Sequence, residues 1–149
     1  MESIYDKSSY DSVMKRLESL PSTATAKWGK MSAAQMLAHC IATYKYAMLE
    51  EEKPRMMAGR LMGWMFKKKL YSDDLYKPGL PTSPDFVVKD ERNFDKEKAE
   101  LIDVTKKFHE AGPGGYGKYP HPFFGKFTTD QWGKMMWKHL DHHLRQFGY

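Results

Sequence analysis

Apolar residues recur at helical spacing in several stretches of the chain, and segments rich in proline, glycine and polar residues separate these stretches. In residues 8 to 21 the pattern predicts a helix, with serines in front as candidate N-caps and Pro21 as a stop. Its apolar face consists of Val13, Leu17 and Leu20. A similar pattern predicts a helix in residues 93 to 112.

That helix is expected to begin at Asn93, a residue that caps helices well, and to stop at Gly112. Its apolar stripe consists of Phe94, Leu101, Val104 and Phe108.

Two further helices are predicted to begin with the same local signal. The sequences GKMSAAQ at 29 to 35 and GKFTTDQ at 125 to 131 both place a Ser or Thr three residues before a Gln. This spacing is typical of a capping box, in which each of the two residues satisfies a backbone N–H group of the first turn. Pro54 limits the first of these helices, and the second runs toward residue 149.

Residues 54 to 70, PRMMAGRLMGWMFKKKL, predict a shorter amphipathic helix that is rich in methionine. The segment from 71 to 92 contains several prolines and has no sustained period, so a surface loop is expected there. Only DFVV, at 85 to 88, resembles a strand. The pattern as a whole predicts an all-α protein.

Composition narrows the class of protein further. The 149 residues suffice for one domain, and the 24 Lys and Arg against 19 Asp and Glu, a net charge of +5, are spread along the chain, which argues against a nucleic-acid partner. A single cysteine, Cys40, excludes an intrachain disulfide framework. No signal region and no long apolar run is present, so we expect a soluble cytoplasmic protein without a membrane partner.

Histidines supply the candidate chemistry. Within KHLDHHLRQFGY, His139 and His143 lie one helical turn apart on the same face, whereas His142 points elsewhere. His39 lies seven residues after Ser32, on the same side of its helix as that cap residue. His139 and His143 likewise lie on the side of their helix that carries its cap residue, Thr128. Two helices that start alike could therefore bring the three imidazoles together.

The neighbours on these faces mix apolar and polar groups, which is typical of a pocket. The candidate pocket residues are Gln35, Thr43, Tyr46, Trp132, Met136 and Gln146. His121, between two prolines, either lines the mouth of this pocket or fixes a loop. Neutral imidazoles are good ligands for divalent transition metals, and three of them leave coordination positions open. Spacing alone leaves a solvated or core histidine cluster as the alternative to a metal site.

Three segments resemble the DUF1569 proteins of the DinB/YfiT-like superfamily: WGKMSAAQMLAHC, DERNFDKEKAEL and HPFFGKFTTDQWGKMMWKHLDHHLRQFG. The resemblance covers most of the chain and implies a single DinB-like domain over residues 1–149, a four-helix bundle with an extra short helix and long loops. It also implies a divalent metal, zinc or nickel, held by His39, His139 and His143. Better characterised relatives are dimers that transfer low-molecular-weight thiols to electrophiles.

Three functional hypotheses follow. The first is a metalloenzyme that activates a small thiol, with a metal-dependent hydrolase as its nearest alternative. The second is a helical bundle that binds a small ligand or a partner without catalysis, and the third is a basic interaction module that uses the lysines of FKKKL at 66 to 70. A homodimer is expected, with MMAGRLMGWMF at 56 to 66 as an adaptable apolar face.

Overall fold

The computed structural model describes residues 2–80, 82 and 84–149, and the prediction of an all-α protein is confirmed for them. Within these ranges, β-type backbone pairing is limited to an isolated antiparallel bridge between His121 and Gly125. The helices, in chain order, are α1 (Lys7–Ser19), α2 (Ala33–Ala47), α3 (Met57–Tyr71), the 3-10 helix η1 (Pro84–Phe86), α4 (Phe94–Ala111) and α5 (Thr129–Gln146).

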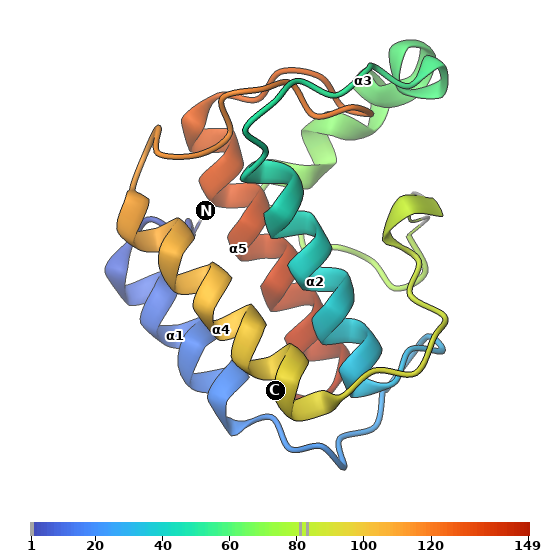
Figure 1. Cartoon of the computed structure of the whole chain (residues 1–149), viewed down its shortest axis with the longest axis vertical. Coiled ribbons are helices and arrows are strands. Elements are labelled where there is room, and N and C mark those ends of the chain that lie inside the picture. Colours follow the sequence, from blue (N-terminus) through green and yellow to red (C-terminus); the bar gives the residue numbers. More distant parts are fainter. Residues whose placement is uncertain (1, 81, 83) are drawn as a thin grey trace.

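Four of the helices lie side by side. Both α1 and α2 pack against α4 and α5, and Figure 1 shows the four with their long axes roughly aligned. The remaining α-helix, α3, packs against α5 and projects from one end of this group, with the loop that carries η1 below it (Figure 1). Within the described ranges, no helix combines the length and the apolar character needed to cross a membrane.

The predicted capping boxes both form. The Ser32 side chain accepts a hydrogen bond from the backbone N–H of Gln35, whose side chain accepts one from the backbone of Ser32. Thr128 and Gln131 make the same two bonds at the start of α5. These caps fix the first turn of each helix and therefore the register of the residues that follow.

The predicted start of α1 is wrong by a few residues. Asp6 is its N-cap residue, and the backbone N–H of Tyr10 donates to the Asp6 carbonyl, so the serines expected to cap the helix lie inside it. Ser9 is buried there. The N-terminal segment is itself held to α5, because the N–H of Ile4 donates to the carbonyl of Gly133 at 3.0 Å. This contact sets the point at which the chain turns into the helix.

The strand-like DFVV segment does not form a strand. Pro84 to Phe86 form η1, and a strand would need a partner, which the described residues do not supply. The Phe86 carbonyl turns inward and accepts a hydrogen bond from His39. For α4, by contrast, the predicted cap and stop are confirmed: Asn93 accepts from the N–H of Lys96, and Gly112 follows the helix at a φ of 66°.

The core lies between α1, α2, α4 and α5. Its largest fully buried side chains include Leu17, Leu37, Tyr44, Leu101, Phe108, Trp132 and Leu140. Cys40 is also fully buried, and burial raises the pKa of its thiol. Phe94, at the start of the predicted α4 stripe, is only partly buried.

α3 is attached to the rest of the protein by glycines and by one buried lysine. A side chain at Gly59 or Gly63 would collide with the backbone of Phe123, so only glycine allows this close approach. At the other end of α3, the buried ammonium of Lys138 donates to the carbonyls of Lys69 and Ser72. A cation beside the last carbonyls of a helix also interacts favourably with the helix dipole.

Replacement of Lys138 with Met should destabilise the protein by roughly 2 kcal/mol, because two carbonyls at the end of α3 lose a charged donor. Urea unfolding measures the change. The matched control is Lys134→Met, one turn earlier on α5, where the ammonium pairs with Asp130 at the surface. That variant should lose no more than about 0.5 kcal/mol. Equal losses in the two variants would contradict the role of Lys138.

Candidate metal centre

Three histidines converge between α2 and α5. His39 extends from α2, and His139 and His143 extend from successive turns of α5. One nitrogen of each ring lies within 4.8 Å of the corresponding nitrogens of the other two, and the Nε2 atoms of His39 and His139 are 3.0 Å apart. The three histidines that the resemblance implied as metal ligands therefore lie together in the structure.

The tautomer of His39 follows from its contact with η1. Its Nδ1 lies 2.8 Å from the backbone carbonyl of Phe86. A carbonyl oxygen can only accept, so Nδ1 carries the hydrogen and donates it. In the neutral ring this leaves Nε2 as a bare lone pair, directed at His139.

His143 is fixed in the same way through a side chain. Its Nδ1 lies 2.8 Å from Oε1 of Gln146, and the amide nitrogen of Gln146 donates to the carbonyl of Trp28 at 2.7 Å. The second bond sets the orientation of the amide. The carbonyl of Trp28 can only accept, so the amide nitrogen of Gln146 must face it, and the amide oxygen then faces His143. His143 therefore donates through Nδ1 and keeps Nε2 as a lone pair.

This arrangement fits a divalent metal ion. Three nitrogens at about 2.1 Å from one tetrahedral ion lie roughly 3.4 Å apart, within the range that the three rings span here. Histidine ligands of metals almost always donate their other N–H to a carbonyl or carboxylate, as His39 and His143 do. The donor set and its supporting hydrogen bonds are therefore compatible with a metal centre.

Burial keeps the imidazoles neutral, which is the form that binds a metal. Burial lowers the pKa of His143 to about 3, and it lowers the pKa of His39 and that of His139 below the ordinary value. The neighbouring rings of the cluster act in the same direction on His139 and His143. His39 and His143 are buried, whereas His139 keeps partial exposure to solvent.

The ring of His142 lies beside that of His143, with centroids 5.1 Å apart. It also lies against the partly exposed Trp28 and the buried Tyr76, with centroids 5.7 and 5.5 Å away. Burial lowers its pKa to about 4. His142 is not part of the three-histidine group.

His121 both fixes a loop and lies close to the site. Its Nδ1 accepts hydrogen bonds from the backbone N–H groups of Phe123 and Phe124. Its ring also packs beside Tyr46 and Phe86, and Phe86 in turn contacts the ring of His39. The two functions considered for His121 from the sequence are thus compatible.

The remaining candidate pocket residues have various surroundings. Thr43 is buried and donates to the backbone carbonyl of His39, and Gln146 orients His143. Gln35 belongs to the capping box of α2, and its side chain also donates to the carbonyl of Asp90. Trp132 and Met136 are buried in the core, with Trp132 beside His121. A pocket formed by these residues stays a prediction.

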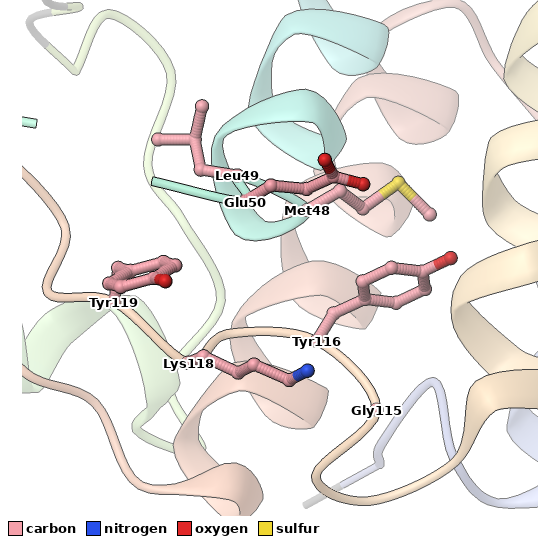
Figure 2. Close-up of a pocket in the computed structure, with 7 residues that line it drawn as sticks. All are labelled: Met48, Leu49, Glu50, Gly115, Tyr116, Lys118 and Tyr119. Atoms are coloured by element: carbon pink, nitrogen blue, oxygen red, sulfur yellow. The ribbon is translucent and has the colours of Figure 1, made fainter. Parts of the chain in front are cut away.

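Two surface clefts lie in other parts of the chain. One, of about 250 Å³, is lined by the end of α2 and the loop after α4, and Figure 2 shows Glu50 and Lys118 on opposite sides of it, with Tyr116 and Tyr119 nearby. The other, of about 260 Å³, lies between α2, α4 and the loop near Val87. Neither is lined by a histidine.

Two groups at the centre were missed by the sequence argument. They are the carbonyls of Phe86 and Trp28, which hold His39 and, through Gln146, His143. A backbone carbonyl has no residue identity, so no motif marks it. The proline-rich composition around Phe86 predicted the loop but not its inward turn.

The fold and the cluster together define an all-α protein with a candidate three-histidine metal centre. The chain belongs to a family described as "Protein of unknown function (DUF1569)", whose profile matches residues 5–148. No curated protein and no solved structure matches the chain.

Replacement of His121 with Asn should reduce the loss of stability at acid pH. Burial, with a smaller effect from Arg55, lowers the pKa of His121 to about 4, below that of an unfolded histidine. The unfolded chain therefore takes up the proton first, and the stability that His121 confers is present above about pH 6.5 and is lost as the pH falls toward 4.

Between about pH 7 and pH 4.5, the metal-free protein should lose roughly 2 to 3 kcal/mol more than the Asn variant. The Asn oxygen can accept the same backbone N–H groups without titrating. Urea unfolding at the two pH values gives the difference, to which the other histidines contribute equally in both proteins. Equal pH dependence in the two proteins would contradict the assignment.

Proposed function

We propose that the chain is a metal-dependent enzyme in which His39, His139 and His143 hold one divalent transition metal, zinc or nickel. The observation that carries this proposal is the pair of Nδ1–H donors on His39 and His143, which leaves Nε2 of each ring free as a ligand. The DinB/YfiT-like arrangement inferred from the sequence, a four-helix bundle with one extra helix in a single domain over residues 1–149, agrees with this ligand set.

When bound, such an ion acts as a Lewis acid that lowers the pKa of a thiol or a water beside it. The histidine group includes no carboxylate among the described residues. Asp141, two residues after His139, is ion-paired with Arg16 and Arg145 and has both oxygens engaged. A protein general base of the kind used by metalloproteases is therefore lacking at the described part of the site.

We infer that thiol transfer suits this site better than hydrolysis. A thiol has a much lower pKa than water and loses its proton without a protein base. In the reaction proposed, the sulfur of a low-molecular-weight thiol displaces a leaving group from an electrophile. The new bond to sulfur replaces the bond to the leaving group, which departs with its electron pair, and the thiol proton passes to solvent. Of the three histidines, His139 keeps partial exposure to solvent.

Purified protein should contain close to one transition-metal ion per chain, as measured by elemental analysis. His39→Ala, His139→Ala and His143→Ala should each remove most of it, because each removes a ligand. Gln146→Leu should weaken binding by roughly tenfold to a hundredfold, because His143 loses the acceptor that orients it.

The matched control is His142→Ala, which removes a buried histidine of the same helix that is not part of the group. A second control is His109→Ala, on α4, where Nδ1 of the ring donates to the backbone carbonyl of Ile4 away from the site. Both should keep the metal. Full occupancy after loss of His139 would contradict the proposed centre.

Metal-loaded protein should accelerate the reaction of a small thiol with a model electrophile, and His143→Ala should abolish the acceleration. The thiols to screen are cysteine and its derivatives, because the resemblance suggests this class. The same two proteins are compared with ester and amide substrates. Equal rates in both proteins, or activity confined to the esters and amides, would exclude thiol transfer and leave a metal-dependent hydrolase or a non-catalytic binding protein.

The expected cytoplasmic location and the expected homodimer stay predictions. The homodimer is expected because the relatives that the sequence resembles are commonly dimers. Sedimentation equilibrium at micromolar concentration measures the oligomeric state, and its outcome also bears on the surface of α3 described below.

A further inference from the structure

The apolar side chains of α3 face away from the protein. Met57, Leu61 and Trp64 are 70%, 71% and 73% exposed, and Met65 is 55% exposed. These four positions recur at intervals of three, four and one, so they form one stripe along the helix. The opposite side of α3, with Gly59 and Gly63, rests on the loop around residue 123. The usual orientation of an amphipathic helix is thus reversed, and we call the exposed stripe the α3 face.

Cations lie along the α3 face, and acidic residues do not. α3 contains Arg60, Lys67, Lys68 and Lys69 and no Asp or Glu. Lys67 is folded back on the body, where it donates to the carbonyl of Lys126 and lies over the Phe127 ring. Arg60, Lys68 and Lys69 are exposed.

The acidic residues that follow α3 do not neutralise this surface. Asp73 and Asp74 act on the ammonium of Lys138, and Asp73 also acts on Lys134. Both lysines belong to α5, so these carboxylates lie toward the body of the protein. The α3 face therefore combines exposed apolar side chains with exposed basic side chains.

Trp64 is suited to an apolar environment. Its indole N–H already donates to the carbonyl of Leu61, one turn earlier, at 3.2 Å. The ring can therefore leave water without leaving a polar group unpaired. Tryptophan is also characteristic of the boundary between lipid headgroups and acyl chains.

We propose, contrary to the expectation from the sequence that the protein has no membrane partner, that the α3 face binds the surface of a membrane that contains anionic lipids. Helices that lie in a bilayer surface have Trp, Leu and Phe on one face and Lys or Arg beside them. The apolar stripe would enter the headgroup region, and Arg60, Lys68 and Lys69 would contact the lipid phosphates. The long stems of these side chains allow the charged ends to stay at the surface while the helix is partly buried.

Charge favours this partner over a second copy of the chain. In a two-fold dimer the same surface meets itself, so α3 packed on α3 would bring three exposed cations against three exposed cations with no acid on either helix. An anionic lipid surface instead attracts each basic residue, with a gain in affinity of about fivefold per residue. The proposal does not depend on the metal centre.

The test is co-sedimentation of the full-length protein with vesicles of phosphatidylglycerol and phosphatidylcholine in equal parts, and with vesicles of phosphatidylcholine alone. The protein should bind the anionic vesicles, and added salt should weaken the binding. Trp64→Ser should weaken it by about tenfold or more, because the largest apolar contact is lost. Lys68→Gln should weaken it by about fivefold.

Matched controls separate this surface from general stickiness. Val87→Ser changes an exposed apolar residue outside α3, and Lys107→Gln changes an exposed lysine on α4. Both should bind as the unchanged protein does. All four substitutions involve exposed side chains, and circular dichroism verifies that the fold is retained.

Absence of binding to anionic vesicles at low salt would overturn the proposal. So would equal binding by the Trp64→Ser variant, which would show that charge elsewhere on the protein is sufficient. A dimer that Trp64→Ser dissociates in sedimentation equilibrium would assign the α3 face to a second copy and would also overturn it. Loss of binding confined to the α3 variants supports it.

Discussion

A buried imidazole ring has to be neutral and hydrogen-bonded, and much of the architecture around α2 and α5 satisfies this requirement. His39 meets it by donating to the carbonyl of Phe86, and His143 does so by donating to Gln146, which is held in turn by the carbonyl of Trp28. Each bond ties a loop to the helices, because Phe86 and Trp28 belong to the connections that follow α3 and α1. The two loops are thereby fixed by the same hydrogen bonds that set the tautomers. Removal of either acceptor leaves a buried N–H group unpaired, which costs about 1 to 3 kcal/mol.

The sequence predicted the registers of α2 and α5 because short-range chemistry determines them. A capping box is a local interaction over four residues, so Ser32 and Thr128 mark the helix starts without help from tertiary structure. Once each start is fixed, the positions of His39, His139 and His143 around their helices follow from helical geometry alone. What local chemistry does not determine is how two helices are placed against each other. The convergence of the three rings depends on the packing of α2 on α5 and on loops whose backbone carbonyls carry no signal in the sequence.

The sequence predictions were wrong for the start of α1 and for the DFVV segment, where long-range contacts outweigh local preference. The serines before Val13 are of a type that caps helices well. The N–H of Ile4, however, is bonded to the carbonyl of Gly133, which holds the chain before the helix against α5. The helix therefore begins earlier, with Asp6 as its N-cap residue. The DFVV segment has β-branched and aromatic residues suited to a strand, but it lacks a partner strand among the described residues. Its first two residues belong to η1 instead. For α3, periodicity correctly predicted an amphipathic helix. Periodicity could not predict which side of α3 faces the protein. The glycine side can approach the backbone of the loop closely, and this contact competes with burial of the methionine and tryptophan side chains.

Lys138 and His139 are consecutive on α5, and this adjacency connects α3 to the histidine cluster. The ammonium of Lys138 holds the last carbonyls of α3, while the ring of His139 meets His39 about a quarter of a turn farther around the same helix. A rotation or a shift of this part of α5 would move both contacts together, because a helix turns as a rigid unit over so short a distance. One turn of α5 therefore contributes to the orientation of the α3 face relative to the cluster, together with the contact of Gly59 and Gly63 with Phe123. A partner bound to α3 would meet the protein at a fixed position with respect to the three histidines, and the buried lysine, which no motif predicted, is one of the residues that impose this relation.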